Sequence, residues 1–259
     1  MKDIWRFIFI LLITFAVLTL YSFSSKTIKI GKIELKKTKI KTFIVGDTIP
    51  VDALIATKVQ TETPKMDSSK QKILLIGDSM LEQFRWAMRD YCEENGHELN
   101  TVMWYSSQSK WFGEYDTLTY YINKLKPTYV ILVLGANELF VSDIKTKRAK
   151  HVKKIVADFD TLPFVWVGPP NWKKDTGINQ LIARYAKKGS YFPTINICLN
   201  NPKFSRYKDG AHPRRSAANY WMDELAIWIQ EESSFPIILN KPEKKGSMST
   251  NTVIIQPIK

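Results

Sequence analysis

The chain has 259 residues, of which 44% are hydrophobic, 24% charged and 12% aromatic. This balance is typical of a folded globular protein rather than a disordered one, and the length predicts one domain with appendages. The formal net charge is +13, but the first 66 residues carry eleven Lys and Arg against five Asp and Glu, and the last 27 carry four Lys against one Glu. The segment between them keeps only +4, which argues against a basic groove and therefore against a nucleic-acid module.

The cysteines and histidines exclude two further classes of protein. Two cysteines, Cys92 and Cys198, cannot build a disulfide framework, and three histidines without a Cys-x-x-Cys motif offer no metal site. We expect Cys92 in a helix and Cys198 in a strand, both as small buried hydrophobic residues. His97 and His151 are expected at the surface. The sequence implies no metal and no organic cofactor.

The N-terminus carries a segment of membrane length. Residues 7–20 (FIFILLITFAVLTL) are apolar or Thr, and the apolar character extends over residues 4–23. A bilayer core about 30 Å thick needs about 20 apolar residues, so this segment predicts a single-pass membrane anchor or a cleaved signal peptide. Lys2 and Arg6 precede it like a signal n-region, but more lysines follow it, against the positive-inside rule. We favour an anchor over residues 1–25, and both alternatives place the remaining chain outside the cytoplasm, in a periplasm or at the cell surface.

Residues 26–71 predict a basic stalk or linker. Residues 27–42 alternate apolar and basic side chains, which fits short strands or a hairpin, or an extended stalk whose lysines face anionic lipid or polymer. Residues 57–71 are polar with one proline, as is typical of a linker. The folded domain is expected over residues 72–232, followed by a loosely packed C-terminal extension over residues 233–259.

Strand and helix patterns alternate regularly within the expected domain. Short apolar runs that are typical of buried strands occupy residues 72–76, 99–104, 129–134, 164–167 and 193–198. Helical patterns occupy residues 80–95, 115–125, 144–159 and 216–231. Such an alternation predicts a parallel sheet of about five strands with helices on both faces, which is a three-layer α/β/α sandwich.

Three polar motifs follow the expected strands or precede the last helix. Gly77-Asp78-Ser79 follows the first strand, Gly135-Ala136-Asn137-Glu138 follows the third, and Asp209-Gly210-Ala211-His212 lies before the last helix. Each motif alone is typical of a turn or a helix cap. Functional groups of open parallel sheets gather at the carboxyl ends of the strands, so we expect these motifs to share one edge of the sheet.

Together the motifs supply the groups for nucleophilic acyl transfer. A serine hydroxyl is a weak nucleophile and needs an adjacent base, so we expect His212 to take the proton of Ser79. Asp209, three residues earlier in the same loop, is expected to fix the tautomer of the imidazole and stabilise its charged form. The side-chain amide of Asn137 and the backbone N–H of Ser79 are expected to bind the oxyanion of the tetrahedral intermediate.

The same motifs resemble blocks I, III and V of the SGNH/GDSL hydrolase family over about residues 72–232. The resemblance implies a flavodoxin-like three-layer fold and esterase activity, with Ser79 as nucleophile, His212 as base, Asp209 as its partner and Asn137 as oxyanion donor. Among the members of this family, the chain is most similar to the extracytoplasmic bacterial branch that acts on O-acyl groups of cell-wall or surface glycans.

The second block departs from the family pattern. Members of the family carry a glycine after the second strand, and the N–H of that glycine is the third oxyanion donor. Residues 105–109 here read Tyr-Ser-Ser-Gln-Ser. Gln108 or a neighbouring serine is the candidate for this third donor. Glu138, where many members carry Asp, is a milder change.

Several residues near the motifs are candidates for substrate contacts. Trp104, Tyr105 and Trp111 fall in or beside the loop after the second strand, and Trp172 follows the fourth. Aromatic rings at a catalytic edge can stack on sugar rings, and packing beneath loops is the equal alternative. Asp78, beside the nucleophile, is a further candidate.

The sequence therefore predicts a membrane-tethered serine esterase or acyltransferase that acts on O-acyl groups, in particular O-acetyl groups, of an extracytoplasmic glycan. Attack of water on the acyl-enzyme gives deacetylation, and attack of a sugar hydroxyl gives O-acetylation. A lipase or lysophospholipase of the same fold, and a non-catalytic glycan-binding or assembly protein that retains the fold, are the alternatives. The oligomeric state stays open.

Overall fold

The computed structural model describes residues 64–247 and 249–258 and, before them, Arg6, Phe9, Thr14 and the segments 29–30 and 33–34. The chain divides into two units, Met1–Glu62 and Thr63–Lys259. In the first unit β1 (Lys29–Ile30) pairs antiparallel with β2 (Ile33–Glu34), in line with the hairpin alternative. Most of the expected membrane anchor lies outside the described residues. Within the part of the chain that the structure describes, no helix is both long and apolar enough to cross a membrane.

The second unit is built on one sheet of six parallel strands, where the sequence predicted about five. From edge to edge the strands are β7 (Tyr191–Phe192), β6 (Phe164–Val167), β5 (Tyr129–Val133), β3 (Lys72–Gly77), β4 (Glu98–Trp104) and β8 (Thr252–Ile255). The central strands β3 and β5 are buried almost throughout, because helices cover both faces of the sheet. Their continuous apolar runs are typical of parallel strands buried on both faces.

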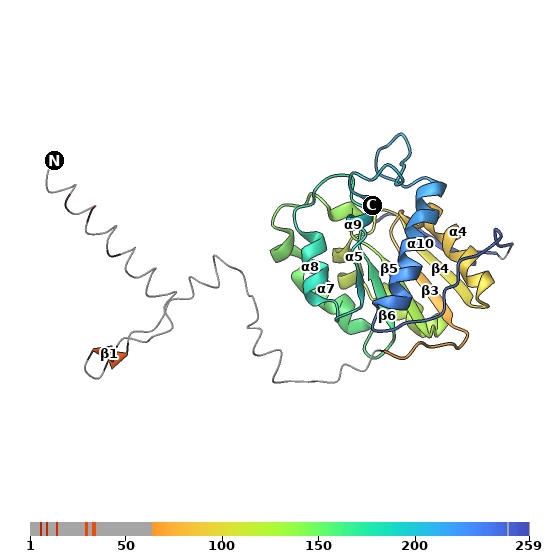
Figure 1. Ribbon diagram of the computed structural model, residues 1–259, viewed down its shortest axis with the longest axis horizontal. Helices are drawn as coiled ribbons and strands as arrows, with labels where there is room; N and C mark the ends of the chain where they lie inside the picture. The colour runs from red at the N-terminus through yellow and green to blue at the C-terminus, as the bar shows by residue number, and fades with distance from the viewer. Residues whose placement is uncertain are drawn as a thin grey trace. The chain divides into compact units, whose positions relative to one another are not determined.

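Helices lie on both sides of this sheet, which gives three layers (Figure 1). The helices of this unit are α4 (Leu81–Glu94), α5 (Ser109–Glu114), α6 (Thr117–Leu125), α7 (Ile144–Asp158), α8 (Ile178–Tyr185), α9 (Ile195–Cys198) and α10 (Arg215–Glu231). One hydrophobic cluster joins α4 and α10 to the sheet, and within it the rings of Phe84 and Trp221 lie 4.6 Å apart. The second cluster joins the helices α5, α6, α7 and α8 to the opposite face of the sheet. In it the rings of Phe159 and Phe164 stack with their centroids 3.9 Å apart.

The prediction of a fifth strand over residues 193–198 is wrong. The strand β7 is shorter and earlier, and residues Ile195–Cys198 form the short helix α9. Pro193 follows β7 directly and has no N–H to continue a ladder, so the strand ends there. Cys198 is buried as expected, but in this helix, where its thiol donates to the carbonyl of Asn171 at 3.3 Å. Cys92 is buried in α4, as predicted.

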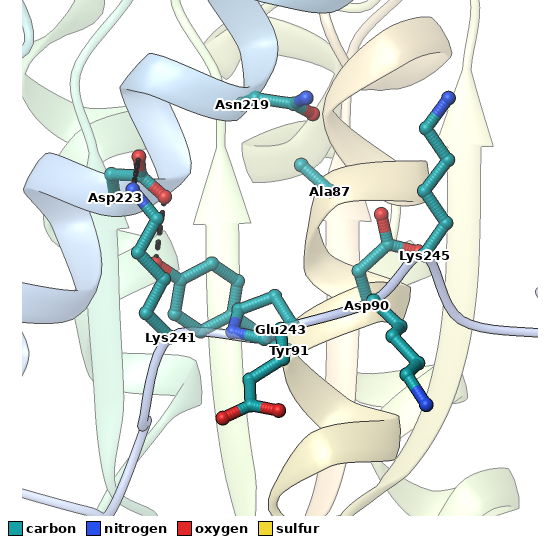
Figure 2. A pocket seen from close by; sticks show the side chains of 10 residues that line it. Ala87, Asp90, Tyr91, Asn219, Asp223, Lys241, Glu243 and Lys245 are labelled. Atoms are coloured by element: carbon teal, nitrogen blue, oxygen red, sulfur yellow. Dashed lines mark hydrogen bonds and ion pairs between the residues drawn. The ribbon is translucent and has the colours of Figure 1, made fainter.

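The C-terminal extension packs on the domain, contrary to the loose tail that the sequence predicted. Ile237 and Leu239 are buried in the first hydrophobic cluster, and β8 adds a parallel strand to the edge of β4. Between them the chain crosses α4 and α10. There Asp223 accepts a hydrogen bond from Tyr91 at 2.7 Å and pairs with Lys241 at 2.6 Å, beside a shallow pocket between these helices and the tail (Figure 2).

Two histidines that the sequence placed at the surface are buried. His97 is 5% exposed because it joins two segments: Nδ1 accepts from the N–H of Gln71 at 3.1 Å, and Nε2 lies 2.8 Å from the carbonyl oxygen of Ile238. These partners assign the proton to Nε2. His151 is 4% exposed and lies under α5, where a Cβ added to Gly113 would lie 2.7 Å from the Cα of His151. Burial lowers the pKa of His151.

The loops after β3 and β5 separate at the carboxyl edge of the sheet. The loop after β3 leads to α4 on one face, whereas the loop after β5 continues through a 3-10 turn, η1 (Ala136–Glu138), to α7 on the other. Ligands of open α/β sheets bind where loops separate in this way. Residues 64–71 lie at the opposite edge of the sheet, where the N–H of Asp67 donates to the carbonyl of Pro236 at 2.8 Å (Figure 1).

Candidate active site

The nucleophile candidate Ser79 lies in the turn between β3 and α4. Gly77, the last residue of β3, approaches β5 so closely that a Cβ there would lie 1.9 Å from the carbonyl oxygen of Val133. This contact brings the carboxyl ends of the two strands together. The Ser79 side chain is largely buried, and its backbone N–H has no acceptor among the described residues.

A hydrogen-bond chain joins Ser79 to His212 and Asp209. Ser79 Oγ lies 2.9 Å from His212 Nε2, and His212 Nδ1 lies 2.8 Å from Asp209 Oδ2. His212 and Asp209 belong to a short hairpin between α9 and α10. In this hairpin Arg206 pairs with Pro213, and the N–H of Tyr207 donates to the carbonyl of His212 at 2.9 Å. The three residues of the predicted triad are therefore brought together.

Backbone groups of the hairpin keep Asp209 ionised. Its Oδ1 accepts from the N–H of Ala211 at 2.8 Å and from the N–H of His212 at 3.0 Å. The hydrogen bond from the N–H of Ala211 has the largest effect on the pKa of Asp209, followed by the bond from the His212 side chain and the bond from the N–H of His212. Together they lower this pKa to about 2. An ionised Oδ2 can only accept, so the His212 proton lies on Nδ1 and Nε2 is left to accept from Ser79.

The structure gives Asp78 a different place from the substrate contact that the sequence suggested. Its side chain is fully buried, with Oδ1 accepting from the N–H of Met80 at 3.0 Å and Oδ2 from the N–H of Ala136 at 3.2 Å. Burial raises the pKa of Asp78 to about 6, although these hydrogen bonds and His212 act in the opposite direction. A substrate cannot reach this carboxylate, which links the loop after β3 to the loop after β5.

The three candidate oxyanion donors lie on adjoining loops. Asn137 is exposed, and its amide donates to the carbonyl of Ser107 at 3.0 Å, which leaves its second hydrogen available. Gln108 lies between two residues whose N–H groups are engaged, and its own N–H makes no hydrogen bond within the described chain. With the N–H of Ser79, this edge offers three uncommitted donors.

A buried ion pair behind these loops escaped the sequence analysis. Glu138 is fully buried and accepts from the N–H and hydroxyl of Ser109, at 2.6 and 2.9 Å, and from Arg148 Nε at 2.5 Å. Arg148 Nη2 also donates to the side chain of Gln108 at 3.2 Å. The pair thus ties α7 to the loop after β4. Glu138 is the last residue of the Asn137 motif, but nothing in the sequence pairs it with an arginine ten residues later.

The aromatic candidates divide into core residues and one cavity residue. Trp104 is 4% exposed, packs on Trp111 with ring centroids 5.4 Å apart, and donates from its indole to the carbonyl of Gln256 at 3.2 Å. It is part of the core, which fits the packing alternative rather than a substrate contact. Trp111 is partly buried and packs against this hydrophobic cluster. The Tyr105 hydroxyl donates to Glu82 at 2.7 Å and fastens its loop to α4.

Trp172 is placed differently from the other aromatic candidates. It is half-buried in the loop after β6, its ring meets the exposed ring of Phe140 edge-on at 5.7 Å, and it lines a surface cavity. Phe140 belongs to the segment that follows Asn137. Trp172 therefore lies at the edge of the sheet that carries the triad.

No group of three or more His, Cys, Asp and Glu side chains within the described residues could hold a metal ion. No protein-family model matches the chain, and a search of curated protein sequences found no match. The class of protein is defined by fold and site: an α/β protein whose parallel sheet carries a Ser-His-Asp hydrogen-bond chain at its carboxyl edge.

Proposed function

We propose that this protein is a serine esterase of the SGNH/GDSL type, which acts through an acyl-enzyme on O-acyl groups of an extracytoplasmic glycan by hydrolysis or acyl transfer. The observation that carries the proposal is the hydrogen-bond chain from Ser79 through His212 to Asp209. The order β4-β3-β5-β6-β7, which is the flavodoxin-like doubly wound order, supports the family assignment. The apolar segment over residues 4–23 supports a membrane tether and an extracytoplasmic location.

The geometry supplies each group of the first half-reaction. Ser79 Oγ attacks the carbonyl carbon of the ester while its proton passes to His212 Nε2, and Asp209 stabilises the imidazolium that forms. The tetrahedral oxyanion takes hydrogen bonds from the free donors of Ser79, Asn137 and Gln108. The imidazolium then gives its proton to the departing sugar oxygen, which leaves the acyl group on Ser79.

The second half-reaction uses the same groups in reverse. His212 takes a proton from the incoming nucleophile, whose oxygen attacks the acyl-enzyme, and returns that proton to Ser79 as the bond to its Oγ breaks. Water as the nucleophile releases a carboxylic acid, and a sugar hydroxyl becomes the new ester. One active site thus serves both hydrolysis and transfer.

The test is hydrolysis of p-nitrophenyl acetate by the full-length chain and by its Ser79→Ala variant. Ser216→Ala is the matched control, because Ser216 lies in α10 and its exposed hydroxyl hydrogen-bonds only to Ser205 among the described residues. Loss of the nucleophile should lower kcat by about 10⁴-fold or more, with circular dichroism and the control variant unchanged. Equal turnover by the Ser79→Ala variant would refute the proposal.

A second set of substrates separates the glycan esterase from the lipase alternative. O-acetylated oligosaccharides, p-nitrophenyl palmitate and a lysophosphatidylcholine are compared at equal enzyme concentration. A higher kcat/KM for the oligosaccharides supports the glycan substrate. Preference for the long-chain esters favours the lipase.

A further inference from the structure

A surface cavity of about 350 Å³ opens beside the catalytic hairpin. Its walls include Trp172 from the loop after β6, and Asn200, Asn201 and Arg206 from the segment between α9 and the hairpin. The volume falls at the lower end of the range of ligand pockets, which is about 300–1,000 Å³. The cavity is therefore large enough for one small ring rather than an extended ligand.

Arg206 links the cavity to the catalytic histidine. Its Nη1 donates to the carbonyl of Ala211 at 2.6 Å, and its Nη2 donates to the carbonyl of Asn171 at 2.8 Å. Ala211 immediately precedes His212, whereas Asn171 immediately precedes Trp172. One guanidinium thus holds the wall of the cavity and the backbone next to His212 in a fixed relative position.

Trp172 also contacts the segment that follows Asn137. The ring of Trp172 meets Phe140, three residues after Asn137, in an edge-on contact. Trp172 consequently lies between the loop that carries Asn137 and the hairpin that carries His212.

The cavity offers hydrogen-bond donors without partners. Across the described chain neither the indole N–H of Trp172 nor the side-chain amide of Asn200 makes a hydrogen bond, and Arg206 has no carboxylate within ion-pair distance. The Asn201 amide, by contrast, is committed to the carbonyl of Ile197 and the hydroxyl of Tyr220. The free groups are thus one aromatic edge, one amide and the unused N–H groups of one cation.

We propose that this cavity is a sugar-binding subsite, which holds the pyranose ring next to the ring whose ester Ser79 attacks. A pyranose presents C–H groups that pack on an aromatic ring and hydroxyl oxygens that accept from Trp172, Asn200 and Arg206. An acyl chain of a lipid would leave these donors unsatisfied, which costs free energy. The subsite rests on the proposed function for its reaction, but its binding of sugar stands on the cavity alone.

The test compares a substrate that fills the cavity with one that does not. A panel of O-acetylated oligosaccharides built on glucose, N-acetylglucosamine or galacturonic acid is compared with p-nitrophenyl acetate. Trp172→Ala should lower kcat/KM for the preferred oligosaccharide about tenfold or more, through KM, because a lost aromatic contact is worth about one tenfold step in affinity. Turnover of p-nitrophenyl acetate should stay within about twofold.

A second variant removes a polar group without disturbing the fold. Asn200 has a φ of 57°, so Asn200→Gly deletes the amide and keeps a residue that tolerates this conformation. It should weaken the binding of the same oligosaccharide about fivefold, because the loss of one hydrogen bond lowers affinity by about this factor. Lys203→Ala, on the neighbouring surface outside the cavity, is the matched control and should leave kcat/KM for both substrates unchanged.

Each outcome decides the proposal. Equal losses on both substrates, or no loss on either in both variants, would overturn the subsite. If no substrate shows Ser79-dependent turnover, the proposed function fails, and calorimetry of the deacetylated oligosaccharides against the Ser79→Ala protein still tests the subsite. Binding that Trp172→Ala abolishes then supports it, and absence of binding across the panel overturns it.

Discussion

The buried carboxylate of Asp78 accepts a hydrogen bond from the N–H of Ala136 at 3.2 Å. Asp78 precedes Ser79, the proposed nucleophile, and Ala136 precedes Asn137, the proposed oxyanion donor. One side chain therefore sets the separation of the loops that follow β3 and β5. Because this carboxylate is buried, its ionisation is coupled to folding.

We predict that the contribution of Asp78 to stability decreases as the pH rises. Burial raises the pKa of Asp78 to about 6 from an ordinary value of 3.8, so the folded protein binds this proton more tightly than the unfolded chain does. Between these values the folded state holds more protons, and stability falls with rising pH. Relative to Asp78→Asn, which does not titrate, the unfolding free energy of the unaltered chain should decrease by roughly 2 kcal/mol from pH 4 to pH 7.

Urea unfolding of the two full-length proteins between pH 4 and pH 8, followed by tryptophan fluorescence, measures this difference. The other carboxylates, such as Asp209 with its lowered pKa, are present in both proteins and cancel. A difference that does not change with pH, or that increases toward neutral pH, contradicts the prediction.

Replacing Asp209 by Asn should remove most of the activity through the tautomer of His212. The Asn oxygen can still accept from the N–H groups of Ala211 and His212, but its amide nitrogen would face His212 Nδ1 and donate to it. The imidazole proton then moves to Nε2, which can no longer accept from Ser79. We expect kcat to fall by about 10³- to 10⁴-fold with little change in KM.

Asp223→Asn is the control for this prediction, because it also removes a carboxylate but at the pocket between α4, α10 and the tail. Its kcat for p-nitrophenyl acetate should match that of the unaltered chain. If Asp209→Asn retains more than a tenth of the activity, Asp209 does not set the tautomer.

The Glu138–Arg148 pair should show strong coupling. Arg148→Met leaves the fully buried carboxylate of Glu138 without its cation, and breaking a buried pair from one side costs about 3–5 kcal/mol. Adding Glu138→Gln removes the stranded charge, so the double variant should regain part of this stability. We expect kcat to follow the same order, because Arg148 also holds the side chain of Gln108.

Urea unfolding and kcat for p-nitrophenyl acetate complete this double-mutant cycle. Lys154→Met, which breaks a partly exposed pair with Asp158 on the same helix, should cost about 1 kcal/mol or less. Additive effects of the Glu138 and Arg148 substitutions would show that the two side chains act independently.

The sequence predicted the central elements well because burial on both faces leaves a clear pattern. The strand β5 is an uninterrupted apolar run, and α4 buries residues at helical spacing. Over the four residues of α9 the pattern Ile-Asn-Ile-Cys fits a strand or a helical turn equally, so the wrong element was chosen. The strand β8 was missed because Val253 and Ile254 are exposed and only pairing with β4 defines it.

The site divides in the same way between local and tertiary information. Ser79, Asn137 and His212 could be predicted together because strand ends of a parallel sheet share one edge. Arg148 and Arg206 could not be, since each works through a contact with a distant segment, and in the sequence each resembles a surface cation. The burial of His97 likewise depends on the tail, which passes over it at Ile238.

The close approach of β3 and β5 at Gly77 yields a last prediction. A Cβ at this position would lie 1.9 Å from the carbonyl oxygen of Val133, and backbone of a central strand cannot move aside without breaking the ladder. Gly77→Ala should therefore cost more than the ~1–3 kcal/mol of ordinary overpacking, and we expect the variant to be largely unfolded by circular dichroism. Gly96→Ala is the control: its φ of +69° strains an alanine, but the nearest atom is a lysine side chain at 3.4 Å, so it should lose only about 1–2 kcal/mol. Equal stability of the two variants in urea would show that β3 and β5 can separate at Gly77, and that Ser79 and Asn137 are not held at a fixed distance by this contact.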